Sequence, residues 1–297
     1  KGMSVPASFV DRRQVRRNFS RAAAGYDAVA VLQREVASRM LERLDYVKIE
    51  PQRVLDLGCG VGATLTALSE RYPKAQVLGA DASEAMLHAG RSQRSRLRWL
   101  LPFLRGRTSS LIAADARALP YQANSIGMIW SNLMLHWLDD PLPAFREMHR
   151  TLEAGGLLMF ATLGPDTLKE LRGSFSDAYA HTQRFIDMHD YGDMLLECGF
   201  SDPVMDQETL TMTYAGFDDL VRDLRQNGAG CAMPSRRRGL MGRSAWFEAR
   251  ARYEALKVDG RLPATFEVVF GHAWKTQPKM TADGGTIVRF DPKQRLR

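Results

Sequence analysis

The chain is poor in cysteine and has no apolar run of the length that a bilayer requires. Its three cysteines, Cys59, Cys198 and Cys231, are widely separated, and no two have the spacing of metal ligands. This usage is typical of a reducing compartment, so we expect a cytoplasmic protein without a metal site. Every apolar stretch is shorter than the roughly 20 residues of a transmembrane helix, so we expect no stable membrane insertion.

Acidic residues are also scarce relative to basic ones. The 297 residues include 41 lysines and arginines against 34 aspartates and glutamates, for a net charge of +7. Such an excess favours an acidic partner, which could be a nucleic acid, an anionic lipid surface or an acidic protein. The length and a hydrophobic fraction of 45% are sufficient for a substantial core, and we expect one large domain without repeats.

The most informative stretch is residues 53–63, where an apolar run is followed by glycines at every second position. Gly58, Gly60 and Gly62 come directly after the run, and residues 63–72 then have the spacing of an amphipathic helix. Glycine allows a tight turn and a close approach of the backbone to a ligand. Strand, turn and helix in this order predict a nucleotide-like cofactor at the carboxyl end of the strand.

Asp56 helps to decide which of two kinds of cofactor the glycine motif binds. The glycine pattern at 58–63 also fits a loose dinucleotide motif, in which the helix would bind a pyrophosphate. A carboxylate at Asp56 would repel a pyrophosphate and favour a ligand with positive charge, such as S-adenosyl-L-methionine. The next two apolar runs end on Asp81 and Asp115, and Asp81 could accept hydrogen bonds from ribose hydroxyls. Alternatively, the three carboxylates only cap the helices that follow them.

Three consecutive strands that end in aspartate, the first followed by alternating glycines, resemble the class I S-adenosyl-L-methionine-dependent methyltransferases. The resemblance implies an α/β, Rossmann-like fold with a seven-stranded, mostly parallel sheet, an N-terminal helical lid and an inserted helical cap. It also implies S-adenosyl-L-homocysteine as a product. The predicted cofactor site consists of Tyr26, Asp56, Gly58, Cys59, Gly60, Asp81, Ala82, Met86, Asp115, Ala116 and Asn132.

The second half of the chain lacks the pattern of glycines and carboxylates. A long segment separates the last two expected strands, which indicates a helical insertion over the substrate face. One of its helices is predicted over residues 166–179. The expected organisation is a lid at 10–45, a methyltransferase domain at 46–275 with cap segments at about 166–190 and 215–262, and a mobile tail at 276–297.

Three residues are candidates for a direct role in the reaction. Asn132 and His136 follow the fourth expected strand, whose end faces the methyl donor in this fold. His136 could be a general base, although a histidine at this place also packs in the core. Tyr26 could close the site and exclude water, or could pack between two helices of the lid.

Further segments resemble the malonyl-acyl-carrier-protein O-methyltransferases of biotin synthesis. They are residues 19–26, 130–133, 160–163, 183–185 and 261–266, and the similarity extends over roughly residues 10–274. It implies methyl-ester formation on the free carboxylate of a malonyl group, which phosphopantetheine carries on an acidic acyl carrier protein. The ester would then serve as a primer toward pimeloyl and biotin.

A second family remains possible. Residues 164–172, 136–137 and 262–265 also resemble a mitochondrial complex I assembly factor of the same fold, associated with arginine hydroxylation. Residues 21–26 together with Arg184 and Arg261 follow the biotin family better. A methyltransferase for another small molecule, or a non-catalytic assembly protein, is a further alternative.

The malonyl carboxylate is ionised at neutral pH, so its methylation requires orientation and desolvation rather than a strong base. A guanidinium matches the geometry of a carboxylate. We therefore expect Arg184, or else Arg261, to hold the oxygen that does not react. The alternative is that both are surface charges or members of ion pairs.

Basic clusters predict where an acidic carrier protein would dock. The expected docking residues are Arg236, Arg237, Arg238 and Arg243, and residues 91–107, with six arginines and no acid, form a second basic stretch. This stretch could also lie on a membrane surface or simply face water. A nucleic-acid methyltransferase would need a binding module or an aromatic motif after the fourth strand, and Ser-Asn-Leu-Met at 131–134 does not fit one. No nucleic-acid partner is predicted.

Overall fold

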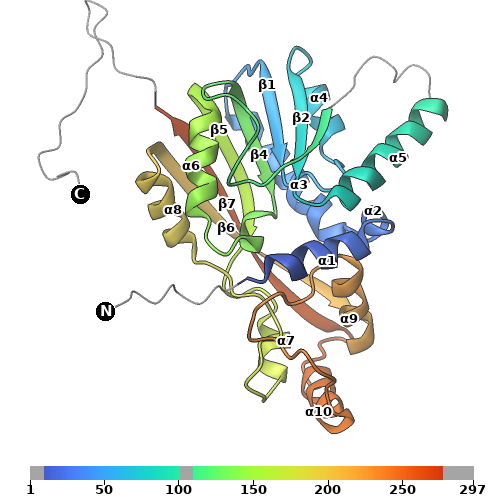
Figure 1. The fold of residues 1–297 in the computed structure, drawn as a ribbon. Coiled ribbons are helices and arrows are strands. Elements are labelled where there is room, and N and C mark those ends of the chain that lie inside the picture. Colours follow the sequence, from blue (N-terminus) through green and yellow to red (C-terminus); the bar gives the residue numbers. More distant parts are fainter. Residues whose placement is uncertain (1–9, 101–109, 277–297) are drawn as a thin grey trace, which may run out of the picture.

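The computed structural model describes residues 10–100 and 110–276, with side chains described outside 95–100 (Figure 1). Within these residues, seven strands form one sheet in the order β3-β2-β1-β4-β5-β7-β6. The strands are β1 (Arg53–Leu57), β2 (Gln76–Asp81), β3 (Ser110–Ala113), β4 (Ile126–Asn132), β5 (Leu152–Leu163), β6 (Phe200–Tyr214) and β7 (Leu262–Lys275). All neighbours are parallel except β7, which is antiparallel to β5 and β6. The predicted fold class is confirmed.

The order of the strands in the sheet reverses between β1 and β4. Strands β2 and β3 lie on one side of β1, and β4 and β5 on the other. In open α/β sheets, ligands bind outside the carboxyl ends of the strands at such a switch point. The topology therefore directs attention to the ends of β1, β2 and β4.

Helices cover both faces of the sheet. They are α1 (Arg12–Ala22), α2 (Tyr26–Val29), α3 (Val31–Arg43), α4 (Leu65–Arg71), α5 (Glu84–Leu100), α6 (Leu142–Thr151), α7 (Lys169–Ser174), α8 (Met188–Glu197), α9 (Phe217–Gln226) and α10 (Arg243–Glu254). Short 3-10 turns are η1 (Leu44–Tyr46) and η3 (Leu135–Trp137). No helix within the described residues is both long and apolar enough to cross a membrane.

Side chains alternate between two buried clusters, one on each face of the sheet. In β1, Val54 packs into the cluster that contains Met40 of α3, whereas Leu55 joins the cluster that contains Phe145 of α6. Successive side chains of a strand point to opposite faces, so near-continuous apolar strands are required when both faces are covered. This explains the uninterrupted hydrophobic runs in the sequence.

The lid and the cap lie together beyond the carboxyl ends of the strands (Figure 1). Helices α1 and α2 of the lid contact α9 of the cap. Helices α9 and α10 are inserted between β6 and β7, as the sequence predicts. The first segment of the expected cap differs from expectation: only Lys169–Ser174 is helical within the predicted 166–179. Gly173 has low helix propensity, and the extended chain after it lets the Phe175 ring stack on His181 at 3.6 Å between centroids.

Two sequence predictions fall on parts of the chain that are not described. The tail expected at 276–297 lies outside the described residues except for its first residue. Residues 101–107 of the basic stretch also lie outside the described residues.

Candidate functional site

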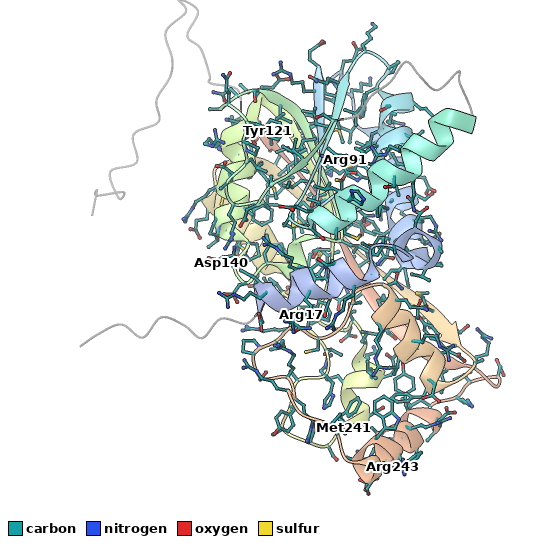
Figure 2. The ribbon with its side chains drawn as sticks, turned by 45° about the vertical axis from the view of Figure 1, so that its right-hand side comes forward. Arg17, Arg91, Tyr121, Asp140, Met241 and Arg243 are labelled. Atoms are coloured by element: carbon teal, nitrogen blue, oxygen red, sulfur yellow. The ribbon has the colours of Figure 1, made fainter. Side chains whose placement is uncertain are left out.

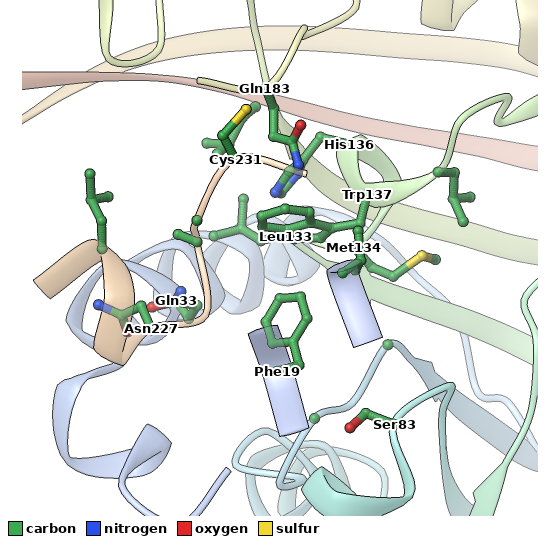
Figure 3. Close-up of a pocket in the computed structure, with 18 of the residues that line it drawn as sticks. Phe19, Gln33, Ser83, Leu133, Met134, His136, Trp137, Gln183, Asn227 and Cys231 are labelled. Carbon is green, nitrogen blue, oxygen red and sulfur yellow. The ribbon is translucent and has the colours of Figure 1, made fainter. Parts of the chain in front are cut away.

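The carboxyl ends of the strands open into a pocket that the lid and the cap cover (Figure 3). Its cavity volume is about 380 Å³, which is within the range of small-molecule and cofactor sites. The lid contributes Phe19 and Tyr26, the strand ends contribute Asp81 and Asn132, and the segment before the cap helices contributes Gln183. Residues far apart in the sequence therefore meet at the switch point of the sheet.

The glycine turn after β1 forms one wall of the pocket. Gly58 has a φ of 79°, and a Cβ atom there would lie 2.5 Å from Cγ of Met134, so a side chain would clash. The Gly60 amide donates to Oδ2 of Asp81 at 2.9 Å, and the Gly58 amide donates to the Ala80 carbonyl at 2.8 Å. These bonds hold the turn against the end of β2 and leave its backbone beside the cavity.

Asp81 presents its carboxylate to the same wall. Its Oδ1 accepts from the Ser83 amide at 2.7 Å, and burial raises the pKa of the carboxyl group even though both oxygens accept backbone hydrogen bonds. A carboxylate oxygen has two lone pairs, so each oxygen retains acceptor capacity. Asp81 and its neighbours Ala82 and Met86 line the pocket, and the role in ribose binding stays a prediction.

Asp56 and Cys59 do not line the pocket, contrary to the sequence prediction. Asp56 points to the same face of the sheet as Val54, whereas Leu57 and Gly58 reach the cavity. It is 1% exposed, and burial raises its pKa to about 7 against a hydrogen bond from Thr64. Its Oδ2 has no partner among the described residues. Asp56 thus lies behind the cavity wall, and its role toward a cationic cofactor stays a prediction.

Asp115 does line the pocket, but arginines already compensate its charge. The Arg117 guanidinium donates to Oδ1 at 2.9 Å, and Arg12 of the lid lies 3.1 Å from Oδ2. These contacts lower the pKa of Asp115 to about 2, chiefly through Arg117. The pair with Arg12 also joins the lid to the end of β3. Ala116 lines the pocket beside it.

The end of β4 brings Asn132 and His136 into the pocket. Nδ2 of Asn132 donates to the Gln33 carbonyl at 2.9 Å, and its buried Oδ1 has no partner among the described residues. His136 is 5% exposed, and burial lowers its pKa to about 3. A neutral imidazole with this pKa binds protons weakly at neutral pH, which argues against the possible role of His136 as a general base and favours the packing alternative.

Aromatic rings of the lid close one side of the pocket. Phe19 lies 5.2 Å from Trp137 and 6.3 Å from Tyr26 between ring centroids, both in edge-to-face geometry. Burial, together with the charge of Asp81, raises the pKa of Tyr26, so its hydroxyl stays protonated. The arrangement supports water exclusion by the lid.

Neither arginine predicted to hold the substrate carboxylate lines this pocket. Arg184 is exposed and borders a second cavity with Asp177 and Tyr179. Arg261 is exposed and donates to Oγ1 and the carbonyl of Thr213, at 2.7 and 2.6 Å. The expected carboxylate-binding position is thus not met by Arg261, because its guanidinium is directed to β6.

Two of the four predicted docking arginines are used within the fold. Arg236 lies 3.1 Å from Asp11 at the start of α1, and its side chain is 17% exposed. Arg237 lies 3.3 Å from Asp177. These pairs tie the chain between α9 and α10 to the lid and to the segment after α7. Arg238 and Arg243 are exposed and form no ion pair with a described residue.

Sequence reasoning missed Gln183. It is 6% exposed and lines the pocket, and neither Oε1 nor Nε2 has a hydrogen-bond partner among the described residues (Figure 3). A buried polar group without a partner is unfavourable unless a ligand satisfies it. The sequence did point to this segment, because residues 183–185 resemble a known family. The carboxylate-binding role was assigned to Arg184, which is charged, rather than to Gln183 beside it.

Comparison with known proteins finds methyltransferases. Residues 55–160 match the family model described as a methyltransferase domain. A malonyl-[acyl-carrier protein] O-methyltransferase of Gallionella capsiferriformans is 49% identical over 282 residues, which cover 94% of this chain and 96% of that protein. One of Laribacter hongkongensis is 48% identical, over 96% of this chain and 98% of that protein.

Solved structures share the fold at low sequence identity. The YcgJ protein of Bacillus subtilis has a TM-score of 0.56 at 14% identity, covering 82% of this chain and 99% of that one. The [4+2]-cyclase SpnF has a TM-score of 0.51 at 19% identity, covering 80% of this chain and 81% of that one. Proteins of this fold differ in chemistry, so these two likenesses concern architecture alone.

Proposed function

The chain belongs to the family of malonyl-[acyl-carrier protein] O-methyltransferases, and from this premise we propose how its pocket performs the reaction. The protein transfers the methyl group of S-adenosyl-L-methionine to the free carboxylate of a malonyl group on an acyl carrier protein. A carboxylate oxygen forms a bond to the methyl carbon, the carbon–sulfur bond breaks, and the sulfonium becomes the neutral thioether of S-adenosyl-L-homocysteine. The ester would serve as a primer for pimeloyl and biotin synthesis.

The residues at the strand ends fit the methyl donor. The turn at Gly58 and Gly60 excludes side chains from one wall, and Asp81 offers carboxylate lone pairs for the ribose. The unpartnered Oδ1 of Asn132 provides an acceptor for the ammonium group or for the polarised hydrogens next to the sulfonium. The bound donor supplies an electrophilic methyl group, and the protein's own task is to align and desolvate the nucleophile.

Gln183 is the residue that we assign to the substrate carboxylate. Its amide Nε2 is buried, lines the pocket and has no partner among the described residues. A carboxylate in the cavity would accept a hydrogen bond from it, which would fix the oxygen that does not react. A neutral amide orients the carboxylate without the charge neutralisation of a guanidinium, so the nucleophile keeps its negative charge for the sulfonium.

The lid and His136 contribute a dry, neutral environment. The contact between Phe19 and Trp137 covers the site, and His136 stays uncharged because burial lowers its pKa to about 3. An ionised carboxylate needs no base, so an uncharged imidazole is sufficient as a wall. Loss of hydration makes the carboxylate more reactive toward the methyl group.

The proposal is tested by offering the purified protein S-adenosyl-L-methionine with either malonyl- or acetyl-carrier protein. Mass analysis should find one added methyl group on the malonyl form and none on the acetyl form, which has no free carboxylate. Methylation of both forms, or of neither, would contradict the proposal. Calorimetry with S-adenosyl-L-homocysteine and with a pyridine dinucleotide, in separate titrations, checks the cofactor: only the first should bind.

A further inference from the structure

Helix α1 carries a large positive charge that the fold does not compensate. Five of its eleven residues are arginine and none is acidic. Arg12 pairs with Asp115. The remaining four are exposed, and their side chains form no hydrogen bond or ion pair with any residue that the structure describes; we call them the α1 arginine face: Arg13, Arg16, Arg17 and Arg21.

These charges do not help α1 to fold. Arg13 and Arg17, and likewise Arg17 and Arg21, are one helical turn apart, where like charges repel each other. Arg13 also lies in the first turn, where the helix dipole disfavours a cation. Packing of α1 depends on its opposite side, where Val15 and Phe19 line the pocket. A local conflict of this kind, without a structural benefit, is typical of a functional surface.

The α1 arginine face is continuous with the mouth of the pocket. Arg16 is exposed and also lines the pocket, as does Arg225 of the contacting helix α9. Arg225 likewise forms no ion pair within the described residues. Figure 2 shows α1, with Arg17 labelled on it, crossing the molecule between the sheet and helices of the cap. An anionic group that approaches this face thus meets the entrance directly.

We propose that the α1 arginine face, together with Arg225, docks the acidic acyl carrier protein, with Arg16 and Arg225 binding the phosphodiester of the pantetheine arm where it enters the pocket. This inference rests on the proposed function and adds the surface through which the substrate arrives. Guanidinium groups bind phosphate oxygens with charge-assisted hydrogen bonds. Acidic side chains of the carrier would relieve the repulsion along α1. Arg236 and Arg237, by contrast, already have acidic partners within the chain.

The test reverses charge on the face without touching the pocket. The variant Arg13→Glu/Arg17→Glu/Arg21→Glu is compared with Lys48→Glu/Arg53→Glu/Lys74→Glu, which changes the net charge equally near the amino-terminal ends of β1 and β2, opposite the pocket. We expect kcat/KM for malonyl-carrier protein to fall by about tenfold or more in the first variant and by less than about twofold in the second. Affinity for S-adenosyl-L-homocysteine and the melting temperature should stay near the wild-type values in both.

Two outcomes would overturn the proposal. One is equal kcat/KM for the α1 variant and its control. The other is a fall in kcat/KM in Arg238→Glu/Arg243→Glu that the α1 variant does not show. This result would place the docking surface at the start of α10 instead. Wild-type kcat/KM should also fall as salt rises, with a shallower slope in the α1 variant. If the wild type itself leaves malonyl-carrier protein unmethylated, the proposed function fails, and that result is distinct from a failure of the docking surface.

Discussion

Replacement of Gln183 by leucine should separate activity from stability. In the free protein, both polar atoms of the amide are without a partner among the described residues, and the side chain is 6% exposed. Removal of an unsatisfied buried group by an apolar one of similar size is neutral or stabilising, by up to about 1–3 kcal/mol. Gln183→Leu should therefore melt at the same temperature as the wild type or higher.

Activity should change in the opposite direction. A hydrogen bond to a charged group contributes about 1.5–3 kcal/mol, so its loss should lower kcat/KM for malonyl-carrier protein by about 10- to 150-fold. Gln183→Glu should be worse, because a carboxylate would then face the substrate carboxylate. Affinity for S-adenosyl-L-homocysteine should not change in Gln183→Leu, since the amide is assigned to the malonyl group.

The matched control is Gln226→Leu, at an exposed glutamine at the end of α9 that does not line the pocket. Steady-state methyl transfer at saturating S-adenosyl-L-methionine, differential scanning calorimetry and titration calorimetry provide the three measurements. Wild-type kcat/KM in Gln183→Leu would refute the reasoning. So would a joint loss of activity, cofactor affinity and melting temperature, because that pattern indicates a structural role.

Four further predictions concern the cofactor side of the pocket, the lid and the neutral wall at His136. Asp81→Asn should weaken S-adenosyl-L-homocysteine binding by about tenfold in calorimetry. Asp56→Asn should hardly change S-adenosyl-L-homocysteine binding. Burial raises the pKa of Asp56 to about 7, so ionisation of this carboxyl group opposes folding, and the wild type should lose melting temperature as the pH rises from 4 to 7. Asp56→Asn should lose less over the same range, and equal losses in both proteins would refute this. Tyr26→Phe should keep activity within about threefold, whereas Tyr26→Ala should lose far more, since the ring closes the site. The rate should show no inflection between pH 6 and 8 from His136, whose pKa is about 3, and a bell-shaped profile that disappears in His136→Gln would argue for a base.

The fold and the cofactor wall could be predicted because their signals are local. Apolar runs, glycines and strand-end aspartates lie within short stretches, and the sheet topology follows from their order. Asp81 and Asp115 line the pocket as a result. Asp56 does not, because the alternation of β1 turns it to the other face. A pattern of residue types alone could not distinguish these two outcomes.

The substrate side depended on contacts between distant residues. Arg184 and Gln183 are adjacent, yet of the two only Gln183 lines the main pocket. A prediction that is wrong by one position therefore assigns the substrate carboxylate to a guanidinium instead of an amide. The ion pairs of Arg236 with Asp11 and of Arg237 with Asp177 join segments far apart in the chain. Charge runs in a sequence do not indicate which cations are already paired, and the α1 arginines became distinguishable only through their lack of partners.

The most direct measurement follows the destination of the methyl group. The protein is incubated with S-adenosyl-L-methionine that carries a ¹³C-labelled methyl group and with malonyl-carrier protein, and the product is analysed by NMR. The account predicts that the label appears as a single methyl ester on the malonyl group and is released by mild base. Label on a nitrogen or sulfur atom, or none on the carrier protein, would contradict it.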